Sequence, residues 1–359
     1  MRITIKKDSK KLLFLKGDAH LKKIVQIIAA LMSAVTVICA FVSCSEPQIR
    51  PKNRIFYDCF DTVGVFYDYS GMSENEFSEL ADRVVKLLRE YHELYDIYNE
   101  YDGKTNLATV NKKAGQGPVV VDKKIINMLL FSKEMYELTN GKVNVAMGSV
   151  LKIWHNYREE GINIPEMELL EKANESTDIN NLVIDEENST VAILDPKTSL
   201  DVGAIAKGYA VEMTAAMLEA EGYSGIVLDV GGNLRVIGEK PNGEGWTAGV
   251  KNPDITSSMQ YVHTFNLKNE ALVTSGSYER FYTVNGVRYH HIINGETLMP
   301  ENYYLSVSVK SASSALSDAL STAIFNMEYE EASEFVQAFK GITVVFVMPN
   351  GEVRTVQGK

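Results

Sequence analysis

The spacing of apolar residues predicts strands and helices along the first part of the chain. The stretch IFYDCFDTVGVFYDY, residues 55–69, is rich in aromatic and β-branched residues and predicts a strand or a hairpin. Ser73 and Glu76 form a capping box that opens a helix. The apolar residues of this helix recur on one face: Phe77, Leu80, Val84, Leu87, Tyr91 and Leu94. Asp122 predicts the start of a second helix that ends near Asn140 and Gly141.

The second half alternates β-rich runs with helices in no regular order. Strands are predicted at GIVLDVGG (225–232) and YYLSVSV (303–309), and hairpins at 281–293 and 342–356. Helices are predicted from Lys207 to Gly222 and from Ser313 to Met327. Without a repeating βαβ pattern, the predicted fold class is α+β or mixed α/β, with largely antiparallel or mixed sheets flanked by helices.

The charge of the chain is unevenly distributed. The 359 residues carry a net charge of −11. Residues 1–44 hold eight Lys/Arg and two Asp/Glu, which gives +6, so residues 45–359 hold 28 basic and 45 acidic groups, which gives −17. A body this acidic repels phosphate backbones, which argues against a nucleic-acid partner. The three cysteines, Cys39, Cys44 and Cys59, indicate neither a disulfide framework nor zinc-ligand spacing.

The N-terminal region has the pattern of a targeting segment. Lys22 and Lys23 precede a long apolar run that ends in small residues before Cys44. The tail FVSCSEPQ resembles a bacterial lipoprotein signal, in which Cys44 becomes the lipidated first residue. A transmembrane anchor and a buried core helix are the alternatives. We therefore expect a signal or anchor over 1–44, a tether over 45–54 and a folded domain over 55–359, held outside the cytoplasm at the cell membrane.

Two histidines lie side by side in a predicted hairpin. Asn285 and Gly286 predict a two-residue type I′ turn, so Val284 pairs with Val287 and Arg280 lies opposite His291. This register puts Tyr278, Tyr282, Arg280 and His291 on one face. It puts Glu279, Phe281 and His290 on the other. A histidine is a plausible proton acceptor near neutral pH, although a lone strand histidine is more often structural.

Three further motifs suggest anion or metal binding. In DVGAIAKGYAVE, Lys207 lies near a helix start, where free N–H groups attract anions. In LDVGGNLRVIG, two glycines after a strand allow close approach of a ligand. In SDALSTA, Asp318 and Thr322 share a helix face and offer the hard oxygen ligands that Mg²⁺ prefers. Taken alone, each motif also fits a surface lysine, a strand-ending turn or a solvated polar face.

The order of these motifs resembles that of a known family. DVGAIAKGYAVE, VLDVGGNLRVIG, WTAGVKNP, VTSGSYERFY, YHHIINGETLMP and SDALSTAIF follow the motif series of the FAD:protein FMN transferases, the ApbE family. FDT, YNEYDGKTNLATVN and TNGKVNVAMGSVLKIW in the first half are also similar. The resemblance covers about residues 56–348.

The resemblance implies that Mg²⁺ holds the pyrophosphate of bound FAD while FMN moves to a Thr or Ser hydroxyl of a partner protein, releasing AMP. Catalysis would use His291, as the base, and Asp318. The implied metal ligands are the Ala204 carbonyl, Asp318 and Thr322. The implied flavin-nucleotide residues are Lys207, Gly231, Gly232, Asn233, Ser275, Gly276, Glu279 and Arg280. The family fold has two lobes with the site between them, and the acceptor is a redox protein at the membrane.

The chain departs from the family pattern directly after His291. Where the family has Asp-Pro-x-Thr-Gly, this chain has Asn294-Gly295-Glu296-Thr297-Leu298. The chain also lacks an acceptor motif of its own, so it is expected to act on another protein. Three hypotheses follow: an FMN transferase, a lipoprotein that binds FAD without transferring it, and a magnesium-dependent FAD pyrophosphatase.

Overall fold

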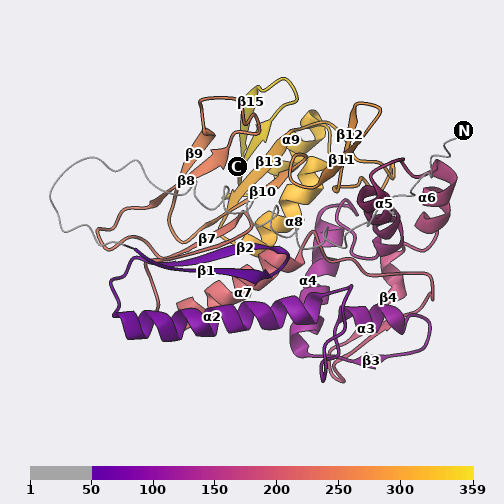
Figure 1. The fold of residues 1–359 in the computed structure, drawn as a ribbon, viewed down its shortest axis with the longest axis horizontal. Coiled ribbons are helices and arrows are strands. Elements are labelled where there is room, and N and C mark those ends of the chain that lie inside the picture. The colour runs from indigo at the N-terminus through magenta and orange to yellow at the C-terminus, as the bar shows by residue number, and fades with distance from the viewer. Residues whose placement is uncertain (1–50) are drawn as a thin grey trace, which may run out of the picture. The chain divides into compact units, whose positions relative to one another are not determined.

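An eight-stranded sheet forms the centre of the part of the chain that the structure, a computed structural model, describes, residues 51–359 (Figure 1). All neighbouring strands in it are antiparallel. Its strands in spatial order are β1 (Lys52–Cys59), β2 (Thr62–Asp68), β6 (Ile226–Val230), β7 (Asn233–Ile237), β10 (Ala271–Gly276), β13 (Ser306–Ser311), β14 (Thr343–Val347) and β15 (Val353–Gln357). The predicted class, mixed α/β with antiparallel sheets flanked by helices, is confirmed.

The two faces of this sheet are covered differently. Helices α2 (Glu74–Tyr95), α7 (Ala206–Ala220) and α8 (Ser314–Phe325) pack on one face, where α7 contacts α2 and α8 (Figure 1). The hairpin of β8 (Trp246–Lys251) and β9 (Tyr261–Leu267) covers part of the other face. Side chains of each strand alternate between the faces: Leu228 packs with the helices and Val227 with the hairpin. Helix α9 (Tyr329–Gln337) lies beside β15.

A smaller part of the fold is built from residues 107–193. Its three-stranded sheet consists of β3 (Val119–Val120), β4 (Leu182–Asp185) and β5 (Thr190–Ile193). Its four α-helices are α3 (Leu107–Lys112), α4 (Lys123–Leu138), α5 (Gly148–Glu160) and α6 (Met167–Asn174). A single hydrophobic core runs from the large sheet into this part and includes Phe66, Leu129 and Val191. The two predicted lobes therefore share one core.

A separate hairpin carries the paired histidines. β11 (Phe281–Val284) and β12 (Val287–His290) pair with Val284 opposite Val287, as the sequence predicts. Asn285 and Gly286 have φ of 50° and 81°, the left-handed values that a type I′ turn requires. The hairpin packs against α5 through a second cluster that includes Trp154, Tyr282 and Leu298. The register prediction is thus confirmed.

Local helix signals are confirmed as well. Glu76 N–H donates to the Ser73 hydroxyl at 3.3 Å and Ser73 N–H donates to Glu76 Oε2 at 2.8 Å, so the capping box is complete. The Asp122 carboxylate caps α4.

The N-terminal predictions fall largely on residues that the structure does not describe. β1 begins at Lys52, inside the segment predicted as a tether, because Lys52 to Phe56 form a ladder with β2. The predicted signal or anchor over 1–44, with Cys44, and the rest of the tether lie outside the described residues. Within residues 51–359, every helix is too short or too polar to cross a bilayer.

Candidate functional site

The start of α7 and the middle of α8 are in direct contact at Asp318. Gly208 N–H donates to Asp318 Oδ2 at 2.7 Å. A Cβ on Gly208 would lie 2.3 Å from the Asp318 Cβ and 2.6 Å from the Ser314 carbonyl oxygen, so this contact requires glycine. The carboxylate therefore lies in the first turn of α7, where the helix dipole favours negative charge.

This contact leaves a backbone carbonyl free. In a regular helix Gly208 N–H would donate to the Ala204 carbonyl, four residues earlier. Because it donates to Asp318 instead, no donor within residues 51–359 bonds to that carbonyl. Thr322 follows Asp318 by one turn of α8 and is half-buried. The three predicted metal ligands, Ala204, Asp318 and Thr322, thus come from two segments in contact.

This set differs from the usual clusters of metal-binding side chains. Within the described residues, no group of three or more His, Cys, Asp or Glu side chains is arranged to hold a metal ion. The set around Asp318 has one carboxylate, one hydroxyl and one carbonyl. Such oxygen donors suit Mg²⁺ when a phosphate ligand and water complete its shell.

Lys207 reaches from α7 to the glycine turn between β6 and β7. Its Nζ donates to the Gly231 carbonyl at 3.1 Å. Gly231 and Gly232 have φ of 55° and 88°, and a Cβ on Gly231 would lie 2.3 Å from the Thr62 hydroxyl. Asp229 Oδ1 accepts from Gly232 N–H at 3.1 Å and holds the turn in place. The predicted lysine and glycines therefore lie together.

The charged groups of this region are poorly solvated. Burial raises the pKa of the Asp318 carboxyl, while Lys207 and Gly208 N–H favour its charged form. Burial lowers the pKa of Lys207, with Asp318 opposing the shift and Arg280 adding to it. Burial also raises the pKa of Asp229. A cation at Asp318 and an anion at Lys207 would each offset this cost of desolvation.

Asn233 gives independent evidence that this region is incomplete. Its side chain is fully buried, and its amide oxygen has no hydrogen-bond partner within residues 51–359. Its amide group is a hydrogen-bond partner of Asp318 and favours the charged carboxylate. Buried polar groups of native proteins are normally satisfied, so this amide fits a site that receives a polar ligand.

Strand β10 brings the remaining predicted residues alongside. Ser275 Oγ lies 2.8 Å from Ser321 Oγ of α8, which ties β10 to the helix that carries Asp318. Gly276 ends β10, and Glu279 and Arg280 follow it as exposed residues. Both charges of this pair act on the pKa of Lys207. The predicted nucleotide residues therefore lie on three segments: the start of α7, the turn between β6 and β7, and the end of β10 with the residues that follow it.

The two histidines have different surroundings, as predicted. His290 is buried; its Nε2 donates to the Glu301 carbonyl at 2.7 Å and its Nδ1 accepts from Ile292 N–H at 3.2 Å. His291 N–H donates to the Arg280 carbonyl at 3.0 Å, and His291 Nδ1 lies 3.3 Å from the same oxygen. Because a carbonyl only accepts, Nδ1 carries the proton and Nε2 is left with a free lone pair.

The free nitrogen belongs to a neutral imidazole. Burial lowers the pKa of His291 to about 3, and the charges of Arg280 and Arg158 and the neighbouring His290 contribute. Of the two histidines, His290 has both nitrogens engaged and His291 alone can accept a proton.

The loop after His291 keeps an ordered turn despite its unusual sequence. Asn294 Oδ1 accepts from Glu296 N–H and the Asn294 carbonyl accepts from Leu298 N–H, both at 2.8 Å. Leu298 has a φ of 60°, the left-handed region that favours glycine, yet it is buried beside Trp154. Trp154 Nε1 donates to the Leu298 carbonyl at 2.8 Å. Packing against Trp154 thus holds Leu298 in a left-handed conformation that a leucine backbone disfavours.

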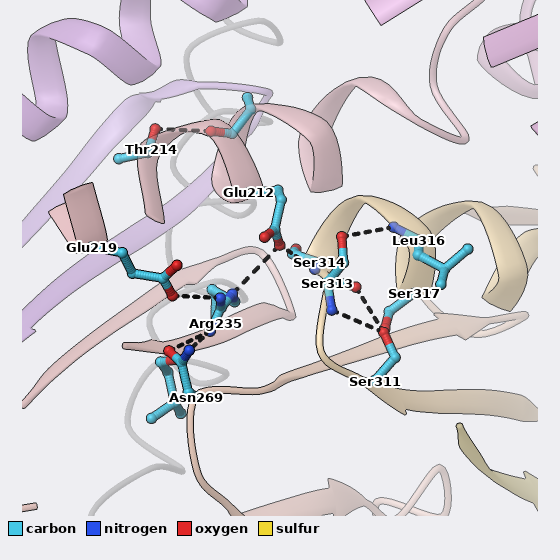
Figure 2. A network of polar contacts seen from close by, with 12 residues as sticks. Glu212, Thr214, Glu219, Arg235, Asn269, Ser311, Ser313, Ser314, Leu316 and Ser317 are labelled. Atoms are coloured by element: carbon cyan, nitrogen blue, oxygen red, sulfur yellow. Dashed lines mark hydrogen bonds and ion pairs between the residues drawn. The ribbon is translucent and has the colours of Figure 1, made fainter. Parts of the chain in front are cut away.

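A polar network joins β7, α7 and the start of α8 (Figure 2). Arg235 of β7 pairs with Glu219 at 2.7 Å and with Glu212 at 3.4 Å, both on α7. Glu212 Oε2 also accepts from Ser314 N–H, at the start of α8, at 2.5 Å. The network therefore links the helix that carries Lys207 to the helix that carries Asp318.

Several site residues were not predicted from the sequence. Asp229 and Asp201 lie inside motifs that were singled out for their neighbours, and burial raises the pKa of both carboxyls. Asp229 lies in the buried strand β6 and Asp201 lies shortly before helix α7, so the sequence signal is a carboxylate in or near a buried element. Arg158 on α5 had no such signal, because its proximity to Arg280 and His291 arises only from tertiary packing.

Comparisons with known proteins identify the family of the chain. The sequence model of the ApbE family matches residues 63–346. An FAD:protein FMN transferase of Treponema pallidum is 31% identical over 339 residues, which cover 90% of this chain and 92% of the relative. An FAD:protein FMN transferase of Escherichia coli K12 is 25% identical over 322 residues, which cover 87% of this chain and 90% of the relative.

Solved structures show the same fold. The crystal structure of the ApbE protein of Thermotoga maritima superposes with a TM-score of 0.76 at 25% identity and covers 86% of this chain and 97% of its own. The flavin transferase ApbE of Vibrio cholerae superposes with a TM-score of 0.71 at 22% identity and covers 86% of this chain and 98% of its own.

Proposed function

The chain belongs to the ApbE family, and on that premise we propose that it transfers FMN from FAD to a threonine or serine hydroxyl of another protein, with release of AMP. One observation carries the proposal. Gly208 N–H donates to Asp318 and leaves the Ala204 carbonyl without a donor within residues 51–359, and Asp318 lies close enough to Lys207 to raise its pKa. Oxygen ligands for a cation therefore lie near a cation for a phosphate. The relatives named above are FAD:protein FMN transferases, and a site that binds a cation beside a phosphate suits the transfer of FMN from FAD.

Magnesium is part of this proposal. The Ala204 carbonyl, Asp318 and Thr322 would hold it, and the Ala204 carbonyl, which accepts no hydrogen bond within residues 51–359, supports the fit. Bound there, Mg²⁺ neutralises charge on the pyrophosphate of FAD.

Residues of the chain bind and orient the pyrophosphate and accept the proton. Lys207 and the first turn of α7 bind and orient the pyrophosphate. His291 Nε2 takes the proton of the acceptor hydroxyl, whose oxygen bonds to the flavin-side phosphorus. The bond between that phosphorus and the bridging oxygen breaks, and the electron pair leaves with AMP. The products are a protein-linked FMN phosphodiester, AMP and a proton on His291, which solvent then takes up.

We also propose where the reaction takes place. The basic Lys22–Lys23 pair and the apolar run before Cys44 support export and lipid attachment at Cys44. The acceptor would then be a redox protein at the same membrane face.

The reaction is tested by labelling. The full chain is incubated with FAD, Mg²⁺ and a protein that bears an acceptor threonine, and flavin fluorescence is read in a denaturing gel. We expect a fluorescent acceptor band that requires Mg²⁺ and the acceptor threonine. It should be lost in Asp318→Ala and kept in Asp254→Ala, which removes an exposed carboxylate.

Two outcomes would replace the proposal. AMP release without a labelled acceptor would indicate an FAD pyrophosphatase, and tight FAD binding with neither product would indicate a flavin-binding protein.

A further inference from the structure

Helix α5 is fixed against the histidine hairpin by Trp154. The Trp154 ring stacks on Tyr289 of β12, with centroids 6.0 Å apart and planes at 23°. Its Nε1 donates to the Leu298 carbonyl beyond the hairpin. Arg158 follows Trp154 by four residues and therefore lies on the same face of α5, directed at the same hairpin.

The hairpin register defines what Arg158 faces. Tyr289 is paired with Tyr282, and side chains of one strand alternate between faces. Arg280, Tyr282, Tyr289 and His291 consequently share the face that α5 covers. Arg158 lies close enough to act on the pKa values of Tyr282 and His291. Two guanidinium groups and the free His291 nitrogen thus border one space.

Neither guanidinium is directly paired with a carboxylate in the described residues. Within residues 51–359, Arg158 and Arg280 form no ion pair with a carboxylate, and the polar contact of Arg158 is with His155 Nδ1 at 3.0 Å. The carboxylates that act on this cluster without pairing are Asp201, Glu159 and, through Tyr98, Asp61. Arg280 lowers the pKa of Arg158 and of Lys207, so three cations follow one another from α7 to α5. Lys207 has carboxylates nearby, since Asp318, Asp229 and Glu279 raise its pKa, whereas the two arginines have no direct ion pair within residues 51–359. Such an arrangement is stabilised by a bound anion.

We propose that Arg158 and Arg280 together bind the flavin-side phosphoryl group of FAD. The inference rests on the proposed function and adds Arg158 as a phosphate-binding residue. His291 is the proposed base, so the hydroxyl that attacks phosphorus must lie beside it, and the groups around His291 face the flavin-side phosphorus rather than the adenosine-side one. Guanidinium groups bind phosphoryl oxygens through paired, charge-assisted hydrogen bonds.

Anion binding here has a consequence for His291. In the free protein, the two arginines help to hold its pKa at about 3. A phosphoryl group between them offsets their charge, so the pKa of His291 rises when the substrate is bound. The imidazole then becomes a stronger base at the moment when a phosphorus atom is present to be attacked.

The test compares ligands with and without the phosphate. Dissociation constants of FMN, riboflavin and AMP are measured for the full chain, for Arg158→Gln and for Arg288→Gln. Arg288 is a matched control: it is exposed on β12 and lies over the Phe281 ring on the opposite face. We expect Arg158→Gln to weaken FMN about tenfold or more, as lost charge-assisted hydrogen bonds imply. Riboflavin and AMP should be unaffected, and Arg288→Gln should match the parent chain.

A second readout separates binding from mere support of the fold. The pKa of His291 is followed by NMR in the parent chain with and without FMN. It should rise on adding FMN, and it should rise in ligand-free Arg158→Gln. Arg158→Lys, which keeps the charge, should retain part of the affinity for FMN.

The outcomes distinguish the inference from the proposed function. Equal weakening of FMN and riboflavin, or weakening of AMP alone, overturns the inference. So does unchanged FMN binding with a raised KM for the acceptor, which would place an acidic group of the acceptor at Arg158. Phosphate-selective loss in a chain that labels no acceptor would support the inference and refute the transferase. Normal labelling of the acceptor and unchanged FMN binding in Arg158→Gln would refute the inference and support the transferase.

Discussion

At the scale of single residues, His291 links the site to the pH dependence of stability. Its pKa is about 3 in the folded chain and near 6.5 when unfolded. Between these values the unfolded chain binds a proton that the folded chain does not, so acidification lowers the free energy of unfolding. One such group contributes at most about 1.4 kcal/mol per pH unit.

We therefore expect His291→Gln to flatten this dependence. Urea unfolding of both chains at several pH values between 6.5 and 4 should show the parent chain losing stability faster. Asp201, Asp229 and Asp318, whose pKa values are raised, act in the opposite direction but are present in both chains. His263→Gln on β9 is the control. Parallel curves for the parent and His291→Gln would contradict the assignment.

Leu298 sets backbone strain against packing. A non-glycine residue at a φ of 60° costs about 1–2 kcal/mol. Truncating a buried leucine costs roughly 2–5 kcal/mol, and Leu298 is 4% exposed. Packing is the larger effect, so Leu298→Gly should lower the free energy of unfolding by about 1–4 kcal/mol, although it removes the strain. Chemical denaturation measures this change, and a stabilised variant would show that strain dominates.

At the scale of elements, the contact between α7 and α8 decides whether the site exists. Gly208→Ala places a methyl group 2.3 Å from the Asp318 Cβ, so the two helices must separate. We expect a loss of about 1–3 kcal/mol in stability and a loss of acceptor labelling, because Asp318 leaves the first turn of α7. Ala216→Ser adds an atom to the exposed face of the same helix and should be neutral. Unchanged labelling in Gly208→Ala would show that the contact is dispensable.

The elements also show which features can be predicted from sequence. The capping box at Ser73 and the Asn285–Gly286 turn were predicted correctly because each depends on residues a few positions apart. The turn at Phe60 and Asp61 has φ of 54° and 50° without any glycine, so the sequence contains no glycine that would have predicted its position. Likewise, Arg158 lies near Arg280 and His291 through tertiary packing, in which Trp154 of the same helix stacks on Tyr289. Local signals thus predict elements, and the order of the motifs predicts residues that the fold brings near one another.

At the scale of the whole molecule, the acidic charge and the proposed membrane attachment lie in different parts of the chain. Residues 45–359 carry −17, and an acidic body is repelled by anionic lipid headgroups. The proposed attachment to the membrane would then come from the N-terminal segment, where the basic residues and the apolar run are found. A lipid on Cys44 and an apolar helix over the preceding residues are the two ways to provide it.

Replacing Cys44 distinguishes these two forms of attachment. When the chain is expressed in bacteria with a clickable fatty acid, we expect the parent chain to be labelled and shortened by cleavage before Cys44. Cys44→Ser should carry no label and keep its full length. Cys59→Ser is the matched control, because Cys59 is fully buried and burial raises the pKa of its thiol to about 12, which makes it unreactive. A parent chain that stays in the membrane fraction, unlabelled and at full length, would show that an uncleaved helix provides the anchor.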